Sequence, residues 1–366
     1  MRAIVLVGGE GTRLRPLTWR TPKQLVPVLG RPLLEHLLLH LRAHGVTAVT
    51  LALTRTRLSE VVHAAFADGG ALGLALDYAY EETPLGSGGA IAAIAGGWAE
   101  PFLVCNGDII TDLDVTAFAA AHRARGAAIS IALHEVDDPS GFGVVALDAN
   151  SRITRFVEKP PREQAPSRLV NAGTWLFEPS AIASLDPTRF QRVEDELFPT
   201  MAAAGGPIFG YAGSALWRDI GNADAYLRVN LELLAGALPA RLPAGWPPER
   251  VLAGAGAHVA PDARVSAPAL LGAGARIDAG ASVEGPAVIG AGAHLATGAL
   301  VRGSVLWERV HVGAGARVID SVLADDVRVG AGAELVGAVV AHGARIADGA
   351  RVAPGSRIEP DAQEGS

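Results

Sequence analysis

Residues 6–32 read LVGGEGTRLRPLTWRTPKQLVPVLGRP, and the rest of the chain is best interpreted outward from this stretch. The aliphatic run from Ala3 to Val7 predicts a strand directly before the glycines. Glycines after a strand let the backbone approach a ligand and direct its N–H groups at anionic oxygens. Arg13, Arg15 and Lys23 follow, and such side chains neutralise phosphate charge. The stretch therefore predicts a nucleotide-phosphate site on the first β-turn.

The composition indicates a globular protein of about two domains, since the chain has 366 residues and 49% of them are hydrophobic. No apolar run approaches the ~20 residues of a membrane span, and the N-terminus resembles a strand rather than a signal peptide. The single cysteine, Cys105, excludes an internal disulfide and fits a reducing cytoplasm. The net charge of −7 argues against a general nucleic-acid binder. We therefore expect a cytoplasmic protein with neither nucleic acid nor a membrane as partner.

The N-terminal part alternates strand and helix patterns, which predicts an α/β fold with a doubly wound, Rossmann-like sheet that becomes mixed after Ala120. The predicted strands are Ala3–Val7, Ala48–Ala52, Leu74–Tyr80, Pro101–Cys105, Ala127–His134, Gly143–Leu147, Thr154–Val157, Leu169–Phe177 and Ile208–Tyr211. The predicted helices are Pro32–His44, Arg57–Phe66, Gly88–Ala95 and Asp224–Leu234. Ligands of such sheets bind at the carboxyl ends of strands, where the Gly8–Arg13 loop and the sequence Asn106-Gly107-Asp108 both fall.

The C-terminal third is a repeat. An aliphatic residue recurs every six positions up to Val301. After that, two series of aliphatic residues recur every 17 positions. The six-residue series is Val259, Val265, Leu271, Ile277, Val283, Ile289, Leu295 and Val301, and the 17-residue series are Val312, Val329, Ile346 and Val318, Leu335, Val352. This pattern predicts a left-handed parallel β-helix in which one side of the later coils is one residue short.

A proline-rich stretch separates the two parts, because prolines at 239, 243, 247 and 248 forbid a continuous helix. We therefore predict a catalytic domain at residues 1–236, a linker at 237–250 and a β-helix at 251–366.

The string GGEGTRLRPLTWRTPKQLVPV at residues 8–28 resembles the signature G-G-x-G-T-R-L-x-P-L-T-x-x-x-P-K-x-x-x-P-V of the sugar-nucleotidyltransferases. The resemblance implies transfer of a nucleotidyl group from an NTP to a sugar 1-phosphate, with release of pyrophosphate. It implies a catalytic role for Arg13 on the β and γ phosphates and for Lys23 near the α phosphate. The implied nucleotide-binding residues of the first loop are Leu6, Gly8, Gly9, Gly11 and Thr12.

Two carboxylates are candidates for a metal site. Asp108 lies in LVCNGD and Asp219 in WRDIG, and taken alone either could be only a turn or helix cap. Two carboxylates together with phosphate oxygens form the usual ligand set of Mg²⁺. The resemblance implies that this pair holds Mg²⁺ and that the ion neutralises charge developing on the phosphates.

Further motifs are implied to bind the sugar phosphate. Glu158 and Lys159 stand in an E-K-P segment and Asn171 in an N-A-G segment, while Gly143 in GFGVV would offer its backbone N–H. Without the resemblance, the Glu158-Lys159 pair would be interpreted as a solvated surface pair. Glu194 and Glu196 in RVEDELFP are weaker candidates for the same role.

The segment EETPLGSGG, with Glu81, Glu82 and Gly86, is implied to contact the base. A carboxylate only accepts hydrogen bonds, and guanine offers N1–H and N2–H₂ side by side, so the two glutamates favour GTP. The alternative is that both glutamates face solvent and that backbone groups recognise the base.

Within the family the chain is most similar to the mannose-1-phosphate guanylyltransferases, although it departs from their pattern at Gln24 and Gly88. Glucose-1-phosphate thymidylyl- or uridylyltransferase and heptose-1-phosphate guanylyltransferase remain open. So do two other classes, a β-helix acyltransferase using a histidine and a non-catalytic regulatory subunit. The histidines in question are His258, His294, His311 and His342. The β-helix is expected to form the contacts of a homo-oligomer.

Overall fold

The computed structural model describes residues 1–9, 11–213, 215–237 and 250–365. The chain forms two compact units. Unit 1 contains Met1–Gly9 and Leu34–Arg218, and unit 2 contains Glu10–Leu33 and Asp219–Ser366. The predicted linker lies outside the described residues apart from its two end residues, so the predicted domain limits stay a prediction.

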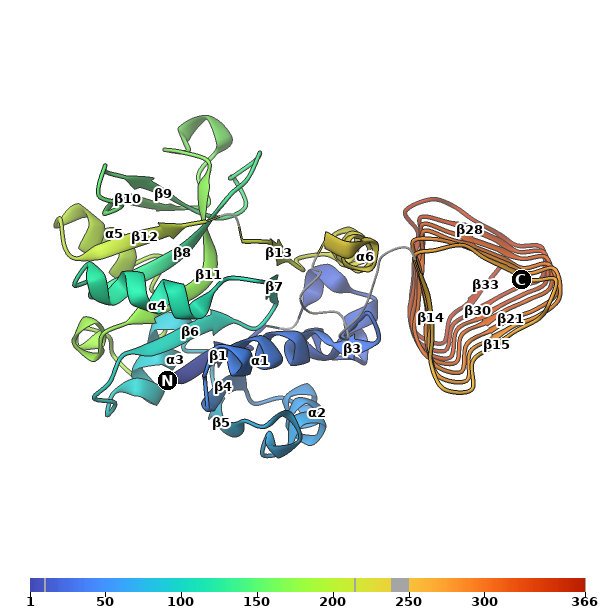
Figure 1. The fold of residues 1–366 in the computed structure, drawn as a ribbon, viewed down its shortest axis with the longest axis horizontal. Helices are drawn as coiled ribbons and strands as arrows, with labels where there is room; N and C mark the ends of the chain where they lie inside the picture. Colours follow the sequence, from blue (N-terminus) through green and yellow to red (C-terminus); the bar gives the residue numbers. More distant parts are fainter. Residues whose placement is uncertain (10, 214, 238–249, 366) are drawn as a thin grey trace. The chain divides into compact units, whose positions relative to one another are not determined.

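Unit 1 is built on a nine-stranded mixed sheet with the order β10-β9-β11-β6-β1-β4-β5; β8 pairs with β11, and β12 pairs with β8 (Figure 1). The strands are β1 (Arg2–Leu6), β4 (Ala48–Thr54), β5 (Ala75–Glu81), β6 (Phe102–Asn106), β8 (Ile129–Glu135), β9 (Gly143–Leu147), β10 (Ile153–Glu158), β11 (Leu169–Phe177) and β12 (Ile208–Ala212). β6, β1, β4 and β5 are parallel, whereas β11 runs antiparallel to β6, so the sheet is mixed as predicted.

The helices of unit 1 confirm the predicted alternation of strands and helices, and two of them were not predicted. The helices of unit 1 are α1 (Leu33–Ala43), α2 (Arg57–Phe66), α3 (Gly86–Ala95), α4 (Val115–Ala124) and α5 (Leu197–Ala203), with α1 beginning at the last residue of a unit 2 segment. The sequence analysis did not predict α4 and α5. An aromatic cluster packs α5 on the sheet, since Phe198 of α5 meets Trp175 edge-on at 5.3 Å and Phe102 stacks on Phe177 at 5.7 Å. These four rings are fully buried.

Unit 2 contains three parallel sheets whose strands stack coil upon coil, as in a left-handed β-helix, and the coils outline a triangle in Figure 1. The first sheet contains β14 (Val251–Ala253), β17 (Ala269–Leu271), β20 (Ala287–Ile289), β23 (Val305–Leu306), β26 (Val322–Leu323), β29 (Val339–Val340) and β32 (Arg357–Ile358). The second contains β15 (His258–Val259), β18 (Arg276–Ile277), β21 (His294–Leu295), β24 (His311–Val312), β27 (Arg328–Val329), β30 (Arg345–Ile346) and β33 (Gln363–Glu364). The third contains β16 (Arg264–Val265), β19 (Ser282–Glu284), β22 (Leu300–Arg302), β25 (Arg317–Ile319), β28 (Glu334–Val336) and β31 (Arg351–Val352).

The repeated aliphatic residues fill the interior of the β-helix from the second coil onward, and Ile277, Leu295 and Val312 are fully buried. Val259 is 39% exposed, because β15 is the end strand of its sheet among the described strands.

The later coils are one residue shorter at the corner where the chain passes from the third sheet to the first. Val288 pairs with Val305, a step of 17 residues, whereas Ala269 pairs with Ala287, a step of 18. Ser304 and Ser321 are fully buried at this corner. Their side chains accept hydrogen bonds from the backbone N–H groups of the next coil.

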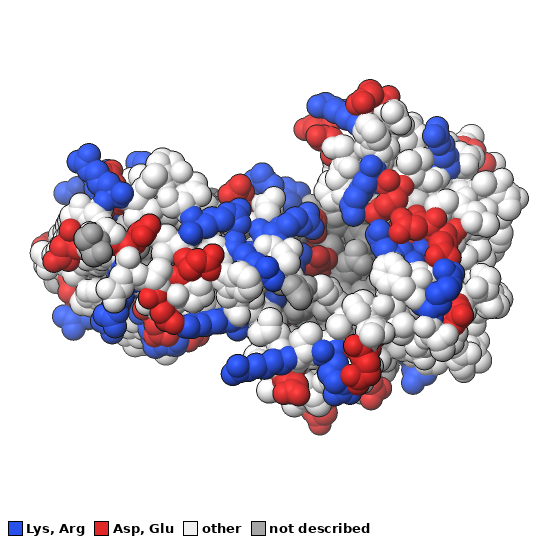
Figure 2. All heavy atoms as spheres, turned by 180° about the vertical axis from the view of Figure 1, so that it is seen from behind, with Lys and Arg blue, Asp and Glu red and all other residues white. Residues whose placement is uncertain are grey.

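Unit 2 also contains the segment of residues 11–33 and α6 (Ala223–Glu232). The segment consists of three 3₁₀ turns and a two-stranded ladder, namely η1 (Thr12–Leu14), η2 (Leu17–Trp19), η3 (Lys23–Leu25), β2 (Pro27–Val28) and β3 (Arg31–Pro32). Among the described residues, no helix is long and apolar enough to cross a membrane. Basic and acidic side chains are interspersed on the face shown in Figure 2, which fits a modest net charge.

Candidate active site

The predicted site residues lie in both units. Unit 1 carries Leu6, Gly8, Gly9, Glu81, Glu82, Gly86, Asp108, Gly143, Glu158, Lys159 and Asn171, and unit 2 carries Gly11, Thr12, Arg13, Lys23 and Asp219.

The parallel strands of unit 1 bring several of these residues to one edge of the sheet. Leu6 at the end of β1 pairs with Asn106 at the end of β6, and Glu81 ends β5 beside Thr54 at the end of β4. The Gly8–Gly9 turn, Asp108 and Glu81 therefore all follow or end strands at the same carboxyl edge, which is where doubly wound sheets bind ligands.

The glycines at this edge serve different purposes. Gly9 has a φ of +103°, and a Cβ there would meet nothing within 4 Å, so its backbone conformation is what requires glycine. Gly107 is required by packing, because a Cβ would lie 2.5 Å from Val7 Cγ1. The N–H of Gly107 donates to the carbonyl of Leu6 at 2.8 Å. This bond fixes the turn that carries Asp108 against the end of β1.

The N-A-G segment lies beside the same turn. Gly173 has a φ of +68°, and a Cβ there would lie 2.6 Å from Asn106 Nδ2. Asn171 Oδ1 accepts hydrogen bonds from Trp175 Nε1 at 2.7 Å and from the Gly173 N–H at 3.0 Å, and so holds a bulge in β11. The oxygen of Asn171 is therefore occupied, and its amide nitrogen is the group that could donate to a sugar hydroxyl.

Gly143 and Glu158 face each other across β9 and β10, since a Cβ on Gly143 would lie 2.8 Å from Glu158 Oε2. Lys159 Nζ lies 3.3 Å from Glu158 Oε1. Arg192 also reaches Glu158, with Nη2 3.1 Å from Oε1. Arg192 was not predicted from the sequence, where only alternating charge marks it, yet it bridges two candidate segments.

The segment EETPLGSGG at residues 81–89 packs against residues 191–194. Gly86 has a φ of +71°, and a Cβ would lie 2.5 Å from the Gln191 carbonyl. Ser87 Oγ donates to Glu194 Oε2 and accepts from the Val193 N–H at 3.0 Å. Glu194 is therefore joined to the glycine-rich start of α3.

The three acidic side chains predicted nearby differ in environment. Glu81 Oε2 accepts from the Leu85 N–H at 3.1 Å, and burial raises the pKa of Glu81 while that hydrogen bond opposes the rise. Glu82 is 76% exposed and pairs with Arg55 at 2.6 Å. Glu196 pairs at the surface with Arg189 at 2.6 Å. Glu81 is thus the half-buried carboxylate of this group, and the other two form surface ion pairs.

In unit 2 the glycine loop closes on the segment that follows it. Gly11 has a φ of +62°, and a Cβ there would lie 3.1 Å from Lys23 Cβ and 3.2 Å from Thr18 Cγ2. Thr18 Oγ1 donates to the Gly11 carbonyl at 2.8 Å. These contacts place the buried Lys23 directly against Gly11.

Arg13 and Asp219 both border Gly221. A Cβ on Gly221 would lie 2.7 Å from Asp219 Oδ2 and 3.4 Å from Arg13 Nη1. The structure therefore brings these two predicted residues together within unit 2.

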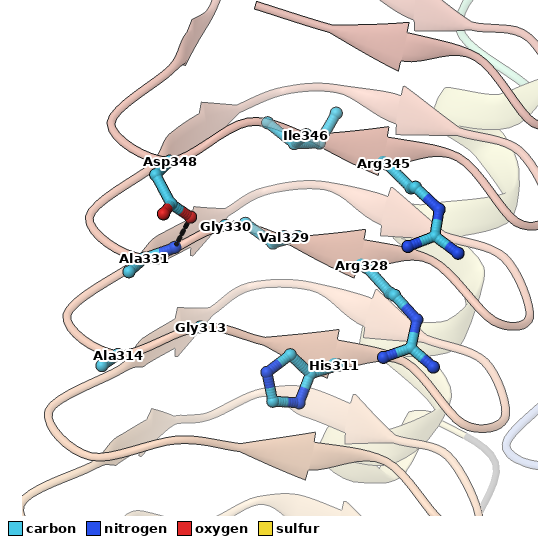
Figure 3. A pocket seen from close by; sticks show the side chains of 10 residues that line it. All are labelled: His311, Gly313, Ala314, Arg328, Val329, Gly330, Ala331, Arg345, Ile346 and Asp348. Atoms are coloured by element: carbon cyan, nitrogen blue, oxygen red, sulfur yellow. Dashed lines mark hydrogen bonds between the residues drawn. The ribbon is translucent and has the colours of Figure 1, made fainter. Parts of the chain in front are cut away.

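A hollow of about 380 Å³ lies on the second sheet of the β-helix (Figure 3). His311, Arg328 and Arg345 stack along one side of it, and Asp348 Oδ1 on the other side accepts from the Ala331 N–H at 2.8 Å. None of the predicted nucleotide, sugar or metal residues lines this hollow.

Comparison with known proteins identifies the family of the N-terminal part and the repeat type of the C-terminal part. Residues 2–236 match the model of the "Nucleotidyl transferase" family, and residues 267–364 match "GlmU-like, C-terminal hexapeptide". The chain is 40% identical over 239 residues to a mannose-1-phosphate guanylyltransferase of Mycobacterium tuberculosis, covering 65% of this chain and 66% of that protein. It is 36% identical over 255 residues to a probable mannose-1-phosphate guanylyltransferase 2 of Arabidopsis thaliana, covering 67% of this chain and 69% of that protein.

Among solved structures, HddC from Yersinia pseudotuberculosis matches with a TM-score of 0.55 and 26% identity, covering 63% of this chain and 99% of that one.

Proposed function

Since the chain belongs to the nucleotidyl transferase family, we propose that it transfers a guanylyl group from GTP to mannose 1-phosphate, giving GDP-mannose and pyrophosphate. One structural observation carries the proposal. The parallel register of β5, β4, β1 and β6 brings the Gly8–Gly9 turn, Asp108 and Glu81 to one carboxyl edge of the sheet. The names of the relatives support the choice of GTP and mannose 1-phosphate.

The proposed reaction is a single displacement. A phosphate oxygen of mannose 1-phosphate attacks the α-phosphorus of GTP, a new P–O bond forms, and the bond between the α-phosphorus and the bridging oxygen breaks in line. Pyrophosphate leaves with that oxygen. No protein nucleophile takes part, so the protein contributes positioning and charge stabilisation.

The proposed roles of the first loop follow from its chemistry. Arg13 and the N–H groups after β1 hold the β and γ phosphates, and Lys23 neutralises charge between the α phosphate and the sugar phosphate. Leu6, Gly8, Gly9, Gly11 and Thr12 form the rest of the nucleotide-binding loop.

Mg²⁺ is proposed as the cofactor, held by Asp108 and Asp219. No group of three or more His, Cys, Asp or Glu side chains suited to a metal occurs in the described part of the chain. Two carboxylates fit Mg²⁺ nonetheless, because this ion completes its coordination with water and substrate phosphate oxygens. When bound, it would supply charge neutralisation on the phosphates.

The sugar phosphate is proposed to bind Lys159 through its phosphate and Glu158, the Asn171 amide and the Gly143 N–H through its hydroxyls. Glu81 is proposed to accept from guanine N1–H and N2–H₂, with Glu82 and Gly86 beside it. Glu81 is the better placed of the two glutamates, because it is half-buried and already oriented by the Leu85 N–H.

The test is pyrophosphate release by the purified protein with Mg²⁺, crossing GTP, UTP, dTTP and ATP with mannose 1-phosphate and glucose 1-phosphate. Release with GTP and mannose 1-phosphate above all other pairs is expected. Faster release with UTP or dTTP and glucose 1-phosphate would contradict the proposed role of Glu81. Arg13→Ala and Lys23→Ala are expected to lower turnover by at least about a hundredfold with circular dichroism unchanged.

We also propose that the β-helix forms subunit contacts of a homo-oligomer and that the protein is cytoplasmic. Light scattering coupled to gel filtration tests the first statement, and a monomer at micromolar concentration would contradict it. Cell fractionation tests the second. The lone Cys105 is buried with a free thiol, and burial raises its pKa to about 12, which agrees with a protein that does not depend on disulfides.

A further inference from the structure

Arg357 of β32 contacts two backbone carbonyls, one within η1 and one directly after it. Its Nη1 donates to the Arg15 carbonyl at 2.6 Å and lies 3.4 Å from the Arg13 carbonyl. Arg357 and its two partners all belong to unit 2. In the chain, Arg357 lies 342 residues after Arg15 and 344 residues after Arg13. A guanidinium keeps its charge at every physiological pH and donates in a fixed plane, so it is suited to hold two neighbouring carbonyls.

A second group of contacts lies further along the segment, at Arg20 and Thr21. The two terminal guanidinium nitrogens of Arg20 donate to the Asp361 carboxylate, and Nη1 donates to Oδ1 at 3.2 Å. Thr21 Oγ1 lies 2.9 Å from Nε2 of His342, a buried histidine in the turn before β30. The late coils of the β-helix thus hold the segment at two separate points before Lys23.

α6 holds the other end of the segment. The Tyr226 hydroxyl donates to the Pro27 carbonyl and accepts from Trp307 Nε1 at 2.9 Å. The Leu29 N–H donates to Asn230 Oδ1 at 2.9 Å. Lys23 therefore lies between an end held by the β-helix and an end held by α6, which is itself bonded to the β-helix through Trp307.

The segment has little local structure of its own. η1, η2 and η3 are three residues each, and 3₁₀ turns of this length have poor hydrogen-bond geometry. Ordering such a chain costs conformational entropy that only tertiary contacts offset. Contacts from distant residues therefore add to the local Thr18–Gly11 hydrogen bond in fixing the path of the backbone around Arg13.

We propose that Arg357 and Asp361 are positioning residues, through which the last coils of the β-helix hold residues 11–32 in the conformation required for nucleotidyl transfer. The inference rests on the proposed function of Arg13 and Lys23. It assigns the β-helix a role in turnover in addition to subunit contacts. Neither residue touches substrate in this account.

The test compares Arg357→Ala with Arg351→Ala. Arg351 lies on the neighbouring β31, its side chain is 87% exposed, and its ion-pair distance to Glu334 is 4.0 Å, so this control removes the same charge without touching the segment. Arg357→Ala is expected to lower kcat/KM for GTP by about ten- to a hundredfold, because small displacements of catalytic groups have effects of this size. KM for mannose 1-phosphate is expected to change less than KM for GTP, since the proposed sugar-binding residues other than Lys23 lie in unit 1.

Amide hydrogen exchange gives a readout that does not depend on activity. Exchange in residues 11–32 is expected to accelerate in Arg357→Ala and to match the wild type in Arg351→Ala. Equal exchange and equal kcat/KM in the two variants would overturn the inference. If the wild type releases no pyrophosphate with any pair, the proposed function fails, and the exchange measurement alone decides whether the segment is anchored.

A charge exchange covers the case in which Arg357→Ala does not fold. Arg20→Asp and Asp361→Arg are each expected to lower kcat/KM for GTP about tenfold, and the double variant is expected to recover most of the loss. Independent, additive losses in the double variant would show that the Arg20–Asp361 contact does not position the segment.

Discussion

At the scale of single residues, several glycines are required by what surrounds them rather than by flexibility. Gly107 lies against Val7 and Gly221 lies against Asp219, and in both cases a Cβ would come within 2.7 Å of a neighbouring side chain. Gly97 is a useful contrast, because a Cβ there would meet nothing within 4 Å and its φ is not positive. The first two positions hold the turns that carry Asp108 and Asp219.

Gly107→Ala is expected to destabilise the protein by about 1–3 kcal/mol, because the new methyl group would force Val7 and the end of β1 apart. Urea unfolding followed by circular dichroism measures the change. Gly97→Ala is the matched control, and its effect is expected to stay within about 1 kcal/mol of the wild type. Equal midpoints for the two variants would show that the turn before Asp108 can relax.

Gly221→Ala is expected to act on activity more than on stability. Its methyl group would displace the Asp219 carboxylate, 2.7 Å away, and crowd Arg13 Nη1 at 3.4 Å. Pyrophosphate release is expected to fall by at least about tenfold, and the concentration of Mg²⁺ giving half-maximal rate is expected to rise. A variant with unchanged Mg²⁺ dependence would argue against Asp219 as a metal ligand.

At the scale of elements, the shortened corner of the β-helix is held by a ladder of serines. Ser304 Oγ accepts from the Ser321 N–H at 3.0 Å and donates to the Arg302 carbonyl at 2.7 Å. Ser321 Oγ repeats the pattern with the Ala338 N–H at 3.0 Å and the Ile319 carbonyl at 2.7 Å. Each serine thus satisfies a buried backbone donor of the next coil.

Ser321→Ala is expected to destabilise the β-helix by about 1–3 kcal/mol, because it leaves the buried Ala338 N–H without its acceptor. Thermal unfolding provides the measurement. Ser282→Ala, on the half-buried outer side of β19, is the control and is expected to change stability by less than about 0.5 kcal/mol. If both serines behave alike, the ladder does not stabilise the corner.

The sequence predicted most elements of unit 1 because their aliphatic runs and flanking glycines are local signals. α5 was not predicted, and its Pro199 occupies the first turn, where proline is tolerated. α4 was missed although Asp114 accepts from the Ala117 N–H as its cap. The contacts of Arg192 with Glu158 and of Arg357 with Arg15 could not be predicted, because the partners are 34 or more residues apart and only the folded chain brings them together.

At the scale of the whole molecule, buried histidines make stability depend on pH. His122 is 1% exposed, and burial lowers its pKa although Glu178 opposes the change. Burial also lowers the pKa of His342, and Arg20 adds to the effect. In the unfolded chain a histidine has a pKa of about 6.5, so below that pH the unfolded state binds more protons than the native state.

Stability is therefore expected to be full above about pH 7 and to fall as the pH drops below about 6.5, by at most about 1.4 kcal/mol per pH unit for each such histidine. Urea unfolding at pH 7.5 and pH 5.5 measures the difference. His122→Gln is expected to reduce the pH dependence while lowering stability at pH 7.5, since the contact with Ser130 Oγ at 2.9 Å is altered. An undiminished pH dependence in this variant would assign the effect to other groups.

The central claim is direct transfer of a guanylyl group to a sugar phosphate, and product analysis with GTP labelled at the α-phosphorus tests it most directly. The purified protein would be incubated with the labelled GTP, Mg²⁺ and mannose 1-phosphate, and the products separated by chromatography. The label is expected to move into GDP-mannose, with one pyrophosphate released per label transferred and no label bound to the protein. Label that stays in GTP, appears as free GMP or remains attached to the protein would contradict it.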